Sequence, residues 1–311
     1  MTNGAYSEAP PGRFLKAADW PSLADQIEVA ADLFGSDGDR LVAGWLDGEV
    51  AKVDDPAYVR LFTEHVSLPG VAPVDYAHRL VRTSRGALLG GIRFYGRDLG
   101  RPFVEIVAHD FDDAEALRAC VRGEWSTFAV CFARLRARPG RITGPDVLLD
   151  KSIHAARYRD MRPSDGRVTL GPFDAAEEAV TLVRRRYDRV TAEQVDLARN
   201  LKPADPDDLD RWHEAGQLDA IRLSGKAIGV LAIAPGRVGW IEGDEINEEV
   251  IDAHHRGHGY ATSAQTTLAA RAETRRERFL VGTIDRYNEP SRRTAERAGR
   301  PRLLDDMFLR L

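Results

Sequence analysis

Hydrophobic and polar positions repeat along this chain with two different periods. Apolar residues at helical spacing predict helices, and alternating or continuous apolar runs bounded by turn residues predict strands. The predicted helices span 21–34, 112–125, 148–161, 174–190, 260–272 and 290–299. The predicted strands span 86–96, 101–111, 129–137, 168–171, 245–253 and 278–284, with a hairpin over 218–236. Helices and strands therefore mix throughout the chain, which predicts an α/β (α+β) protein.

The two halves of the chain repeat one order of elements. "GALLGGIRF" (86–94) matches "GKAIGVLAI" (225–233) in its glycine and apolar positions, and a strand, a helix and a strand follow in both halves. The segment "RPSDGR" (162–167), with its proline and glycine, is typical of a domain boundary. We therefore expect a disordered tail and two domains, over 1–12, 13–162 and 163–311.

Composition narrows the classes of function. Of the 311 residues, 43% are hydrophobic and 30% are charged, as in soluble globular proteins. The net charge of −5 speaks against a nucleic-acid binder, which is usually basic. The chain has two cysteines, no signal-peptide pattern at its start and no apolar run near the roughly 18 residues of a membrane span. These features predict a cytoplasmic protein without a membrane partner.

The segment "HHRGHGYATSAQTTLAARA" (254–272) joins a predicted strand to a predicted helix through a basic, glycine-containing loop. The first amides of a helix have no partner within the helix, and its dipole adds partial positive charge there. Gly257 and Gly259 carry no Cβ, so an anion can approach the backbone, and Arg256 and His258 add side-chain donors. This combination predicts a phosphate or pyrophosphate site.

Three loop patterns bind phosphate in this way. No GxxxxGK[ST] motif is present, and the Rossmann pattern fails because Gly259 is followed by Thr262 where the third glycine belongs. Residues 256–261 match the third pattern, R/Q-x-x-G-x-G/A. The structural alternative is that the loop is only a tight turn. A metal site is not expected, because the three histidines of 254–258 have no acidic or thiol ligands at metal-like spacing.

A second motif lies downstream of the loop. "LVGTIDRYNEPSRRTAERAG" (280–299) contains N-x-x-[SA] as Asn288 and Ser291, and Gly299 closes the helix. With both motifs in this order, the region from Val168 to Leu311 resembles the GCN5-related N-acetyltransferase (GNAT) superfamily. The fold that this implies is two tandem GNAT-like domains, each a mixed, mostly antiparallel sheet flanked by helices. The first of them is degenerate, because acidic "DDAEA" (112–116) stands where the loop would be.

The resemblance implies acetyl-CoA as co-substrate and assigns its contacts. The strand before the loop, through Glu249, Val250 and Ile251, would pair with the pantetheine arm. The pyrophosphate would lie on the loop, and the downstream motif would contact the cofactor. The binding residues implied for these two segments are Arg256, Gly257, His258, Gly259, Tyr260, Ala261, Thr262, Asn288 and Ser291.

Proton transfer needs a base, and the strand before the loop is acidic, with Glu242, Asp244, Glu245, Glu248 and Glu249. In the histone-acetylating branch of the family, the base stands eleven residues before the loop, which corresponds to Glu245; Glu249 is the second catalytic candidate. Strand alternation places both on one face unless a bulge intervenes. The alternative is that these acids only form a solvated rim. The tyrosine that many family members use as general acid is Ala295 here, and the adjacent Tyr287 is a substitute of unknown direction.

The resulting hypothesis is an acetyl-CoA-dependent N-acetyltransferase that passes an acyl group directly to the amine of a small molecule in a ternary complex. It would bind neither metal nor nucleic acid and would be a monomer or a homodimer. Two alternatives stay open. The chain could be an aminoacyl or peptidyl (Fem-like) transferase, or a CoA-binding regulator without catalysis.

Overall fold

The computed structural model describes residues 16–311, so the predicted tail over 1–12 lies outside the described residues. The chain divides into two compact units, and each is described by itself. The described residues of the first unit are 16–150 together with 304–311, and those of the second are 151–303. The two boundaries fall inside strands β5 (Val147–Arg157) and β11 (Arg302–Arg310).

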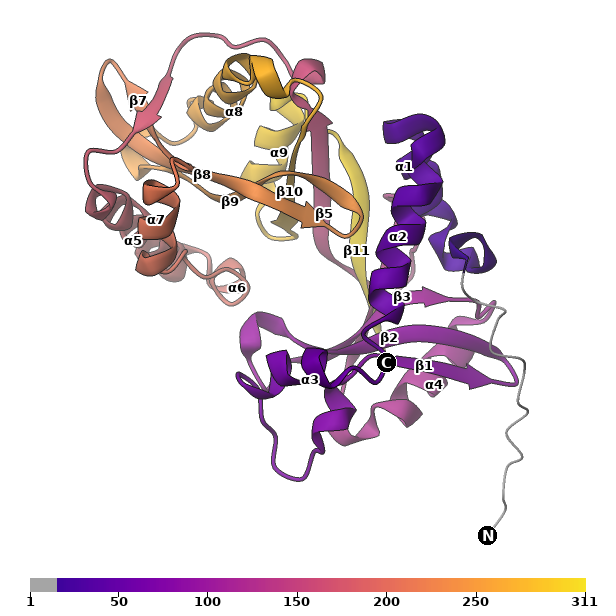
Figure 1. Cartoon of the computed structure of the whole chain (residues 1–311). Helices are drawn as coiled ribbons and strands as arrows, with labels where there is room; N and C mark the ends of the chain where they lie inside the picture. Colours follow the sequence, from indigo (N-terminus) through magenta and orange to yellow (C-terminus); the bar gives the residue numbers. More distant parts are fainter. Residues whose placement is uncertain (1–15) are drawn as a thin grey trace. The chain divides into compact units, whose positions relative to one another are not determined.

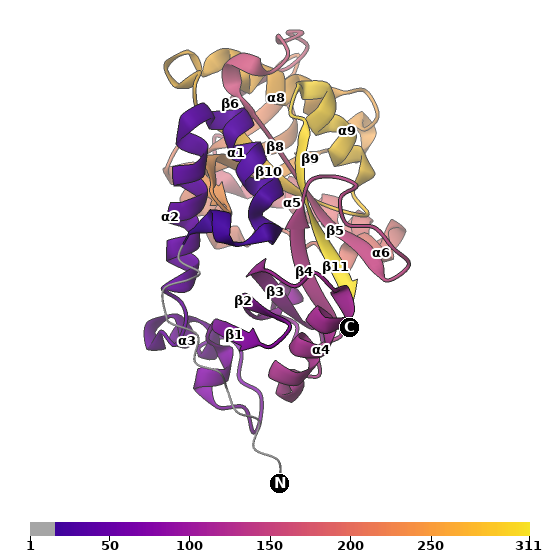
Figure 2. The same cartoon turned by 90° about the vertical axis from the view of Figure 1, so that its right-hand side faces the viewer.

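The sheet of the first unit has the strand order β1-β2-β3-β4-β11. Its strands are β1 (Arg79–Thr83), β2 (Gly86–Phe94), β3 (Pro102–His109), β4 (Phe132–Ala137) and the end of β11. The first three form an antiparallel meander, β4 runs parallel to β3, and β11 is antiparallel to β4. The helices are α1 (Ala24–Phe34), α2 (Gly38–Val50), α3 (Pro56–Thr63) and α4 (Ala114–Glu124). Figure 2 shows α1 and α2 side by side, with α4 on the other side of the strands.

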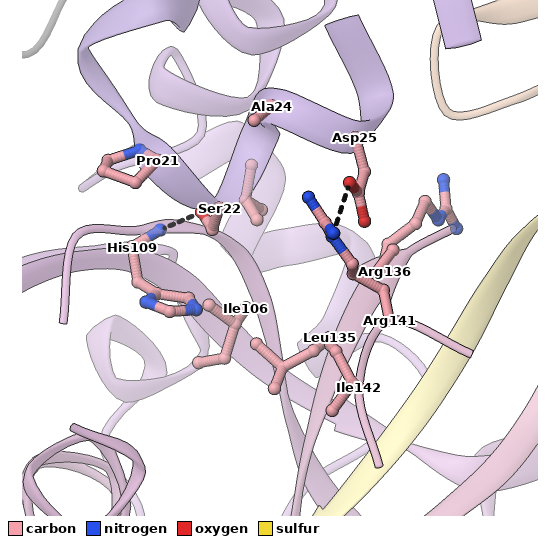
Figure 3. Close-up of a pocket in the computed structure, with 12 residues that line it drawn as sticks. Pro21, Ser22, Ala24, Asp25, Ile106, His109, Leu135, Arg136, Arg141 and Ile142 are labelled. Atoms are coloured by element: carbon pink, nitrogen blue, oxygen red, sulfur yellow. Dashed lines mark hydrogen bonds and ion pairs between the residues drawn. The ribbon is translucent and has the colours of Figure 1, made fainter. Parts of the chain in front are cut away.

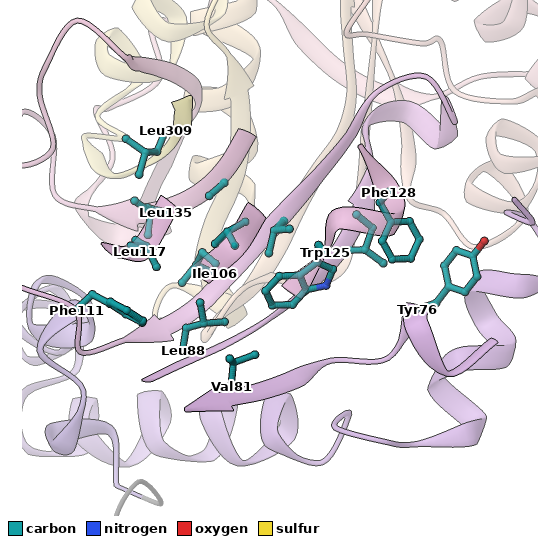
Figure 4. Packing of buried hydrophobic residues seen from close by; sticks show 14 of the residues in the cluster. Tyr76, Val81, Leu88, Ile106, Phe111, Leu117, Trp125, Phe128, Leu135 and Leu309 are labelled. Atoms are coloured by element: carbon teal, nitrogen blue, oxygen red, sulfur yellow. The ribbon is translucent and has the colours of Figure 1, made fainter. Parts of the chain in front are cut away.

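The core of the first unit lies between this sheet and α4 (Figure 4). Leu117 of α4 and Trp125 behind it are fully buried, and they pack with Leu88 of β2 and Ile106 of β3. The α4 sequence places its apolar positions on one face, which is why this helix covers the sheet.

The sheet of the second unit has the strand order β5-β10-β9-β8-β7-β6. Its further strands are β6 (Thr169–Pro172), β7 (Leu218–Leu223), β8 (Lys226–Val238), β9 (Ile241–Ile251) and β10 (Phe279–Asp285). All neighbours are antiparallel except β9 and β10, which are parallel. The helices are α5 (Ala176–Glu193), α6 (Val195–Ala198), α7 (Pro206–Glu214), α8 (Tyr260–Arg271) and α9 (Glu289–Ala298).

Two apolar clusters hold this second sheet. Helices α8 and α9 lie on one face, where Leu268 and Ala298 pack on Leu231 and Leu280. Helices α5 and α7 lie on the opposite face, where Val183, Leu209 and Trp212 pack on a set that includes Val230 and Val250 (Figure 1). The α/β class predicted from the sequence, with a mixed and mostly antiparallel sheet flanked by helices in each half, is confirmed.

One predicted element is wrong. Residues 148–161 were expected to be a helix, yet Val147–Arg157 forms β5, which pairs with β10 along Lys151–Arg157. The segment 152–156 is buried throughout, so apolar and polar positions do not alternate. A strand covered on both faces loses its period of two and can be mistaken for a buried helix.

Six further helices and strands lie in stretches for which the sequence predicted nothing. They are α2, α3, α6, α7, β1 and β11. Both cysteines, Cys120 and Cys131, are free. Within residues 16–311, none of the helices is long and apolar enough to cross a membrane.

Candidate functional site

The glycine loop of the second unit forms the geometry that the sequence predicts. β9 ends at Ile251, a single 3-10 turn covers Ala253–His255, and α8 begins at Tyr260. Gly257 and Gly259 have φ values of +82° and +79°, a left-handed backbone that glycine adopts without strain. Gly259 is the N-cap residue of α8 and offers no side-chain acceptor to the first amides. The first turn of α8 therefore keeps its positive end free for a ligand.

A cavity of about 370 Å³ opens over this turn. Its wall combines the end of β9, the loop, the start of α8, residues along α9 from its N-cap to its last turn, and one residue of α5. The lining residues are Arg186, Glu249, Ile251, His255, Arg256, Gly257, Gly259, Tyr260, Ala261, Thr262, Asn288, Glu289, Pro290, Ser291, Arg293, Thr294 and Arg297. We call it the loop pocket. The two motifs found in the sequence thus lie on one cavity.

Two predicted contact residues do not line the loop pocket. The Val250 side chain is buried against α5 and α7, on the other face of the sheet. The His258 carbonyl accepts a hydrogen bond of 2.8 Å from Arg167 Nη1. Arg167 also pairs with Asp165, whose other oxygen accepts the Ser263 hydroxyl of α8. The segment 162–167, which the sequence indicated only as a domain boundary, thus contacts the loop and α8 through Arg167 and Asp165.

The loop pocket is rich in cations. Arg256 was expected from the loop pattern, whereas Arg186, Arg293 and Arg297 come from α5 and α9. The Nη1 of Arg186 and the Nδ1 of His255 are buried without a hydrogen-bond partner among the described residues. Burial lowers the pKa of Arg186, and the neighbouring Arg256 guanidinium lowers it further. Two crowded guanidinium cations, one of which has a buried unused donor, favour an anion between them. In the sequence, Arg186 is the last of three consecutive arginines (184–186), and no motif singles it out.

The downstream motif has a structural part as well as a pocket position. Asn288 is the N-cap of α9, and its Oδ1 accepts the amide of Ser291 at 3.4 Å. Ala295, at the family's tyrosine position, is fully buried. Tyr287 is 42% exposed, and its hydroxyl accepts a hydrogen bond from Arg286. Asn288 therefore caps α9, and Tyr287, which precedes it, is the phenol close to this motif.

β9 and β10 separate shortly after they meet. Their parallel pairing covers three residue pairs, the last of which is Val281 with Glu245. Beyond it, β10 stays paired with β5 and β9 stays paired with β8. A register shift between Ala232 and Ile233 leaves Asn247 as an extra residue in β9. This is a β-bulge, which reverses the side-chain alternation after it.

The bulge sends the two catalytic candidates to opposite faces. Glu245 pairs with Ala234, on the face of α5 and α7. Glu249 accepts a hydrogen bond of 2.8 Å from Gln265 of α8, on the other face. The alternation that placed both on one face therefore does not hold, because the intact strand it required is interrupted.

The acidic strand supplies few free carboxylates. Asp244 is buried and forms ion pairs with Arg275 and Arg278. Glu248 is buried, with its oxygens bonded to the Tyr187 hydroxyl and the Ala204 amide. Glu242 is exposed.

Burial raises the pKa values of three acids on this strand, Glu245, Glu248 and Glu249. Burial raises the pKa of Glu245, which the Lys151 ammonium partly opposes. A carboxylate with a raised pKa is the better proton acceptor.

Glu249 belongs to a buried polar chain. Its Oε2 accepts from Gln265, whose own oxygen accepts Arg300 Nε at 3.1 Å. The Arg300 carbonyl lies 3.2 Å from His154 Nδ1, and His154 Nε2 lies 3.1 Å from the Ser152 hydroxyl. Among the described residues, Glu249 Oε1 and Arg300 Nη1 have no hydrogen-bond partner. Burial raises the pKa of Glu249 to about 7 and lowers that of Arg300 to about 10.

Neither a search of family models nor a search of curated proteins finds a match. Several of the solved structures that this chain resembles are described as acetyltransferases or GNAT proteins. A GCN5-related N-acetyltransferase from Sphaerobacter thermophilus is 14% identical, with a TM-score of 0.47, over 94% of this chain and 92% of that one. A GNAT-family acetyltransferase from Colwellia psychrerythraea is 10% identical (TM-score 0.45), over 85% and 96% of the two chains. A tandem GNAT protein from the clavulanic acid biosynthesis pathway is 14% identical (TM-score 0.41), over 87% and 94%.

Within residues 16–311, no cluster of three or more histidine, cysteine, aspartate or glutamate side chains has the arrangement of a metal site. The histidines of the loop stand instead beside arginines.

Proposed function

We propose that this protein is an acetyl-CoA-dependent N-acyltransferase whose cofactor binds in the second unit. The observation that carries the proposal is the loop pocket, in which an uncapped helix start, two left-handed glycines and four arginines line one cavity. The expected acceptor is the amine of a small molecule.

The loop pocket fits the phosphates of coenzyme A. The first residues of α8 line a cavity where the Gly257 backbone is open, with no atom within 4 Å of the place that a Cβ would take. Arg256 and Arg186 add charge, and each can donate two parallel hydrogen bonds to a phosphate. An arginine with an unused buried donor is costly when alone and stabilising once an anion is bound. The domain predicted over 163–311 is therefore our assignment for cofactor binding.

The free edge of β9 suits the pantetheine arm. After Glu245 this edge no longer pairs with β10, so its amides and carbonyls are available to an extended ligand. The edge ends at Ile251, which lines the loop pocket. A cofactor held at its phosphates by the loop would therefore direct its thioester end back along β9, toward the bulge.

Acetyl-CoA would supply the activated acyl group. In the transfer, the amine nitrogen forms a bond to the acyl carbon, the carbon–sulfur bond breaks, and one proton leaves the nitrogen. Strand amides near the bulge would polarise the acyl oxygen. We assign the proton acceptor to Glu245, because it lies at the divergence of the two strands and its pKa is raised by burial.

The departing thiolate requires less help than an alkoxide would. A thiol has an ordinary pKa near 8.5, so the thiolate is a tolerable leaving group at neutral pH and water can protonate it. Ala295 cannot act as an acid, and the exposed Tyr287 is the nearby phenol. We therefore expect catalysis without a dedicated acid.

The test is thiol release from acetyl-CoA with a panel of amines, combined with calorimetric binding of acetyl-CoA to the full chain. Binding with turnover on at least one amine supports the proposal. Binding without turnover on any amine favours a CoA-liganded regulator. Turnover only with aminoacyl donors, without acetyl-CoA binding, would favour the Fem-like alternative.

A further inference from the structure

Glu249 is an anionic side chain on the wall of a cationic pocket. It lines the loop pocket beside Ile251, yet its Oε1 is buried and has no hydrogen-bond partner within residues 16–311. Its Oε2 is fixed by Gln265, one turn beyond the start of α8. The carboxylate therefore lies just behind the surface on which the proposed function places the phosphates.

The groups that face Glu249 come from several elements. Gln265 of α8 is neutral, and Arg300, which follows α9 and donates to Gln265, is the cation that lowers the Glu249 pKa. Glu248 on the same strand opposes ionisation. The charged and titratable groups elsewhere in the pocket wall are Arg186 on α5, His255 and Arg256 in the loop, Tyr260 at the start of α8, and Glu289, Arg293 and Arg297 on α9.

Bringing phosphates into this pocket sets two negative charges close together in a poorly solvated region. Like charges that are buried together cannot both persist cheaply, and a carboxylate in that position takes up a proton. Burial has already raised the pKa of Glu249 to about 7, so only a modest further push is needed near neutral pH. The unused Oε1 can carry that proton and donate a hydrogen bond, which an ionised carboxylate cannot do.

We propose that Glu249 is a proton-linked binding residue of the loop pocket, which meets the phosphates of the ligand as a neutral carboxylic acid. This inference rests on the proposed function, because it requires that the loop pocket binds a phosphate-bearing cofactor. The step is a protonation only, and no bond to carbon or sulfur forms or breaks. One proton passes from solvent to Glu249 Oε1 as the ligand enters.

The sign of the effect follows from linkage. Binding raises the pKa of Glu249, so affinity is fully expressed below about pH 7 and falls as the pH rises above it. With complete linkage the dissociation constant rises about tenfold for each pH unit. Glu249→Gln keeps the shape and a donor but cannot ionise, so its affinity at high pH should exceed that of the wild type.

The experiment is calorimetric titration of the full chain with acetyl-CoA from about pH 6 to about pH 8.5. The proteins are the wild type, Glu249→Gln and His255→Gln. His255→Gln is needed because any histidine in the pocket that lost a proton as the pH rises would also weaken acetyl-CoA binding. The titration of the ligand's own phosphates is common to all three proteins and cancels in the comparison. We expect Glu249→Gln to flatten the pH dependence and His255→Gln to retain at least most of it.

Each outcome decides between the proposals. An equal slope in the wild type and Glu249→Gln, or a slope lost only in His255→Gln, overturns the role of Glu249 and leaves the proposed function intact. If the wild type fails to bind acetyl-CoA at any pH, both proposals fail.

A second measurement does not depend on the folding of Glu249→Gln. Proton uptake is read from binding enthalpies of the His255→Gln protein in buffers of different ionisation enthalpy. An uptake near one proton at about pH 8, where the carboxyl group of the free protein is mostly ionised, supports the proposal. No uptake there contradicts it.

Discussion

Each of the two units contains a strand, a crossing helix and a parallel strand, but only one has the features of an anion site. The two segments are β3–α4–β4 in the first unit and β9–α8–β10 in the second. In both, the parallel strands pair over only a few residues and then separate. The first unit pairs Val104 with Ala133 and Glu105 with Arg134 before its strands diverge.

The starts of the two crossing helices differ. The N-cap residue of α4 is Asp113, whose carboxylate accepts the amides of Glu115 and Ala116. These hydrogen bonds lower the pKa of Asp113 and use the donors that an anionic ligand would need. The N-cap residue of α8 is Gly259, which uses none. A helix that caps itself with a carboxylate stabilises its own fold, whereas one capped by glycine keeps its amides for a ligand.

The gap between the diverging strands differs as well. In the first unit the chain's own segment before and within α1 covers it, as Figure 3 shows. The Ser22 hydroxyl oxygen accepts the backbone amide of His109 at 2.7 Å, and Asp25 accepts that of Arg138 at 3.0 Å. A cavity of about 200 Å³ is left between them. If the second unit alone binds the cofactor, as we propose, the cap residue and the covering segment decide binding, and the shared strand–helix–strand arrangement does not.

The largest expected effect comes from returning a carboxylate to the loop of the second unit. Gly257→Asp should weaken acetyl-CoA binding by about 100-fold or more, because a negative charge enters the pocket beside the α8 amides. The measurement is calorimetric affinity.

The matched control for this variant is Gly225→Asp in the β7–β8 turn. It has the same left-handed φ (+83°) and open surroundings, so it bears the same backbone strain without reaching the pocket. Equal affinities of the two variants would show that the loop is only a turn.

The next effect concerns proton removal in the second unit. Glu245→Gln should lower kcat by about 100-fold, the usual scale for loss of a general base, while acetyl-CoA affinity changes little. The defect should shrink as the pH rises, because the acceptor amine, with an ordinary pKa near 10, then loses its proton in solution. Glu242→Gln, an exposed acid on the same strand, is the control. If Glu245→Gln left kcat unchanged and Glu242→Gln lowered it, the base would be the exposed Glu242 and not Glu245.

A smaller loss is expected from the cation that α5 contributes. Arg186→Gln should weaken acetyl-CoA binding by about tenfold, since one charge-assisted contact is removed. Arg184→Gln, on the exposed side of the same helix, should have no effect. Equal affinities for both variants would exclude α5 from the binding site.

These residues also show where sequence reading succeeds. The loop is recognisable because glycines, a basic residue and a helix start are adjacent in the chain, so local spacing carries the information. Arg186 and Arg300 could not be found in that way, since each reaches the region from a distant element and only the fold brings it there. The β9 bulge was foreseen as a possibility, but its position depends on pairing with β8. The β5 strand was missed because both of its faces are buried.

The smallest effect tests the covering segment of the first unit. Ser22→Ala should destabilise the protein by about 1–2 kcal/mol, because the His109 amide loses its acceptor in a partly buried setting. Acetyl-CoA affinity should not change. Ser84→Ala, in the exposed β1–β2 turn, is the control, and the readout is the urea midpoint. A gain of a second binding site in Ser22→Ala would mean that the segment, rather than the missing loop, blocks the first unit.

The central claim is that only the second unit binds the cofactor, and stoichiometry tests it most directly. Titration of the full chain with acetyl-CoA should give one molecule per chain, and Gly257→Asp should remove that single site. A stoichiometry of two, or a site that survives in Gly257→Asp, would contradict the contrast between the acid-capped α4 and the glycine-capped α8.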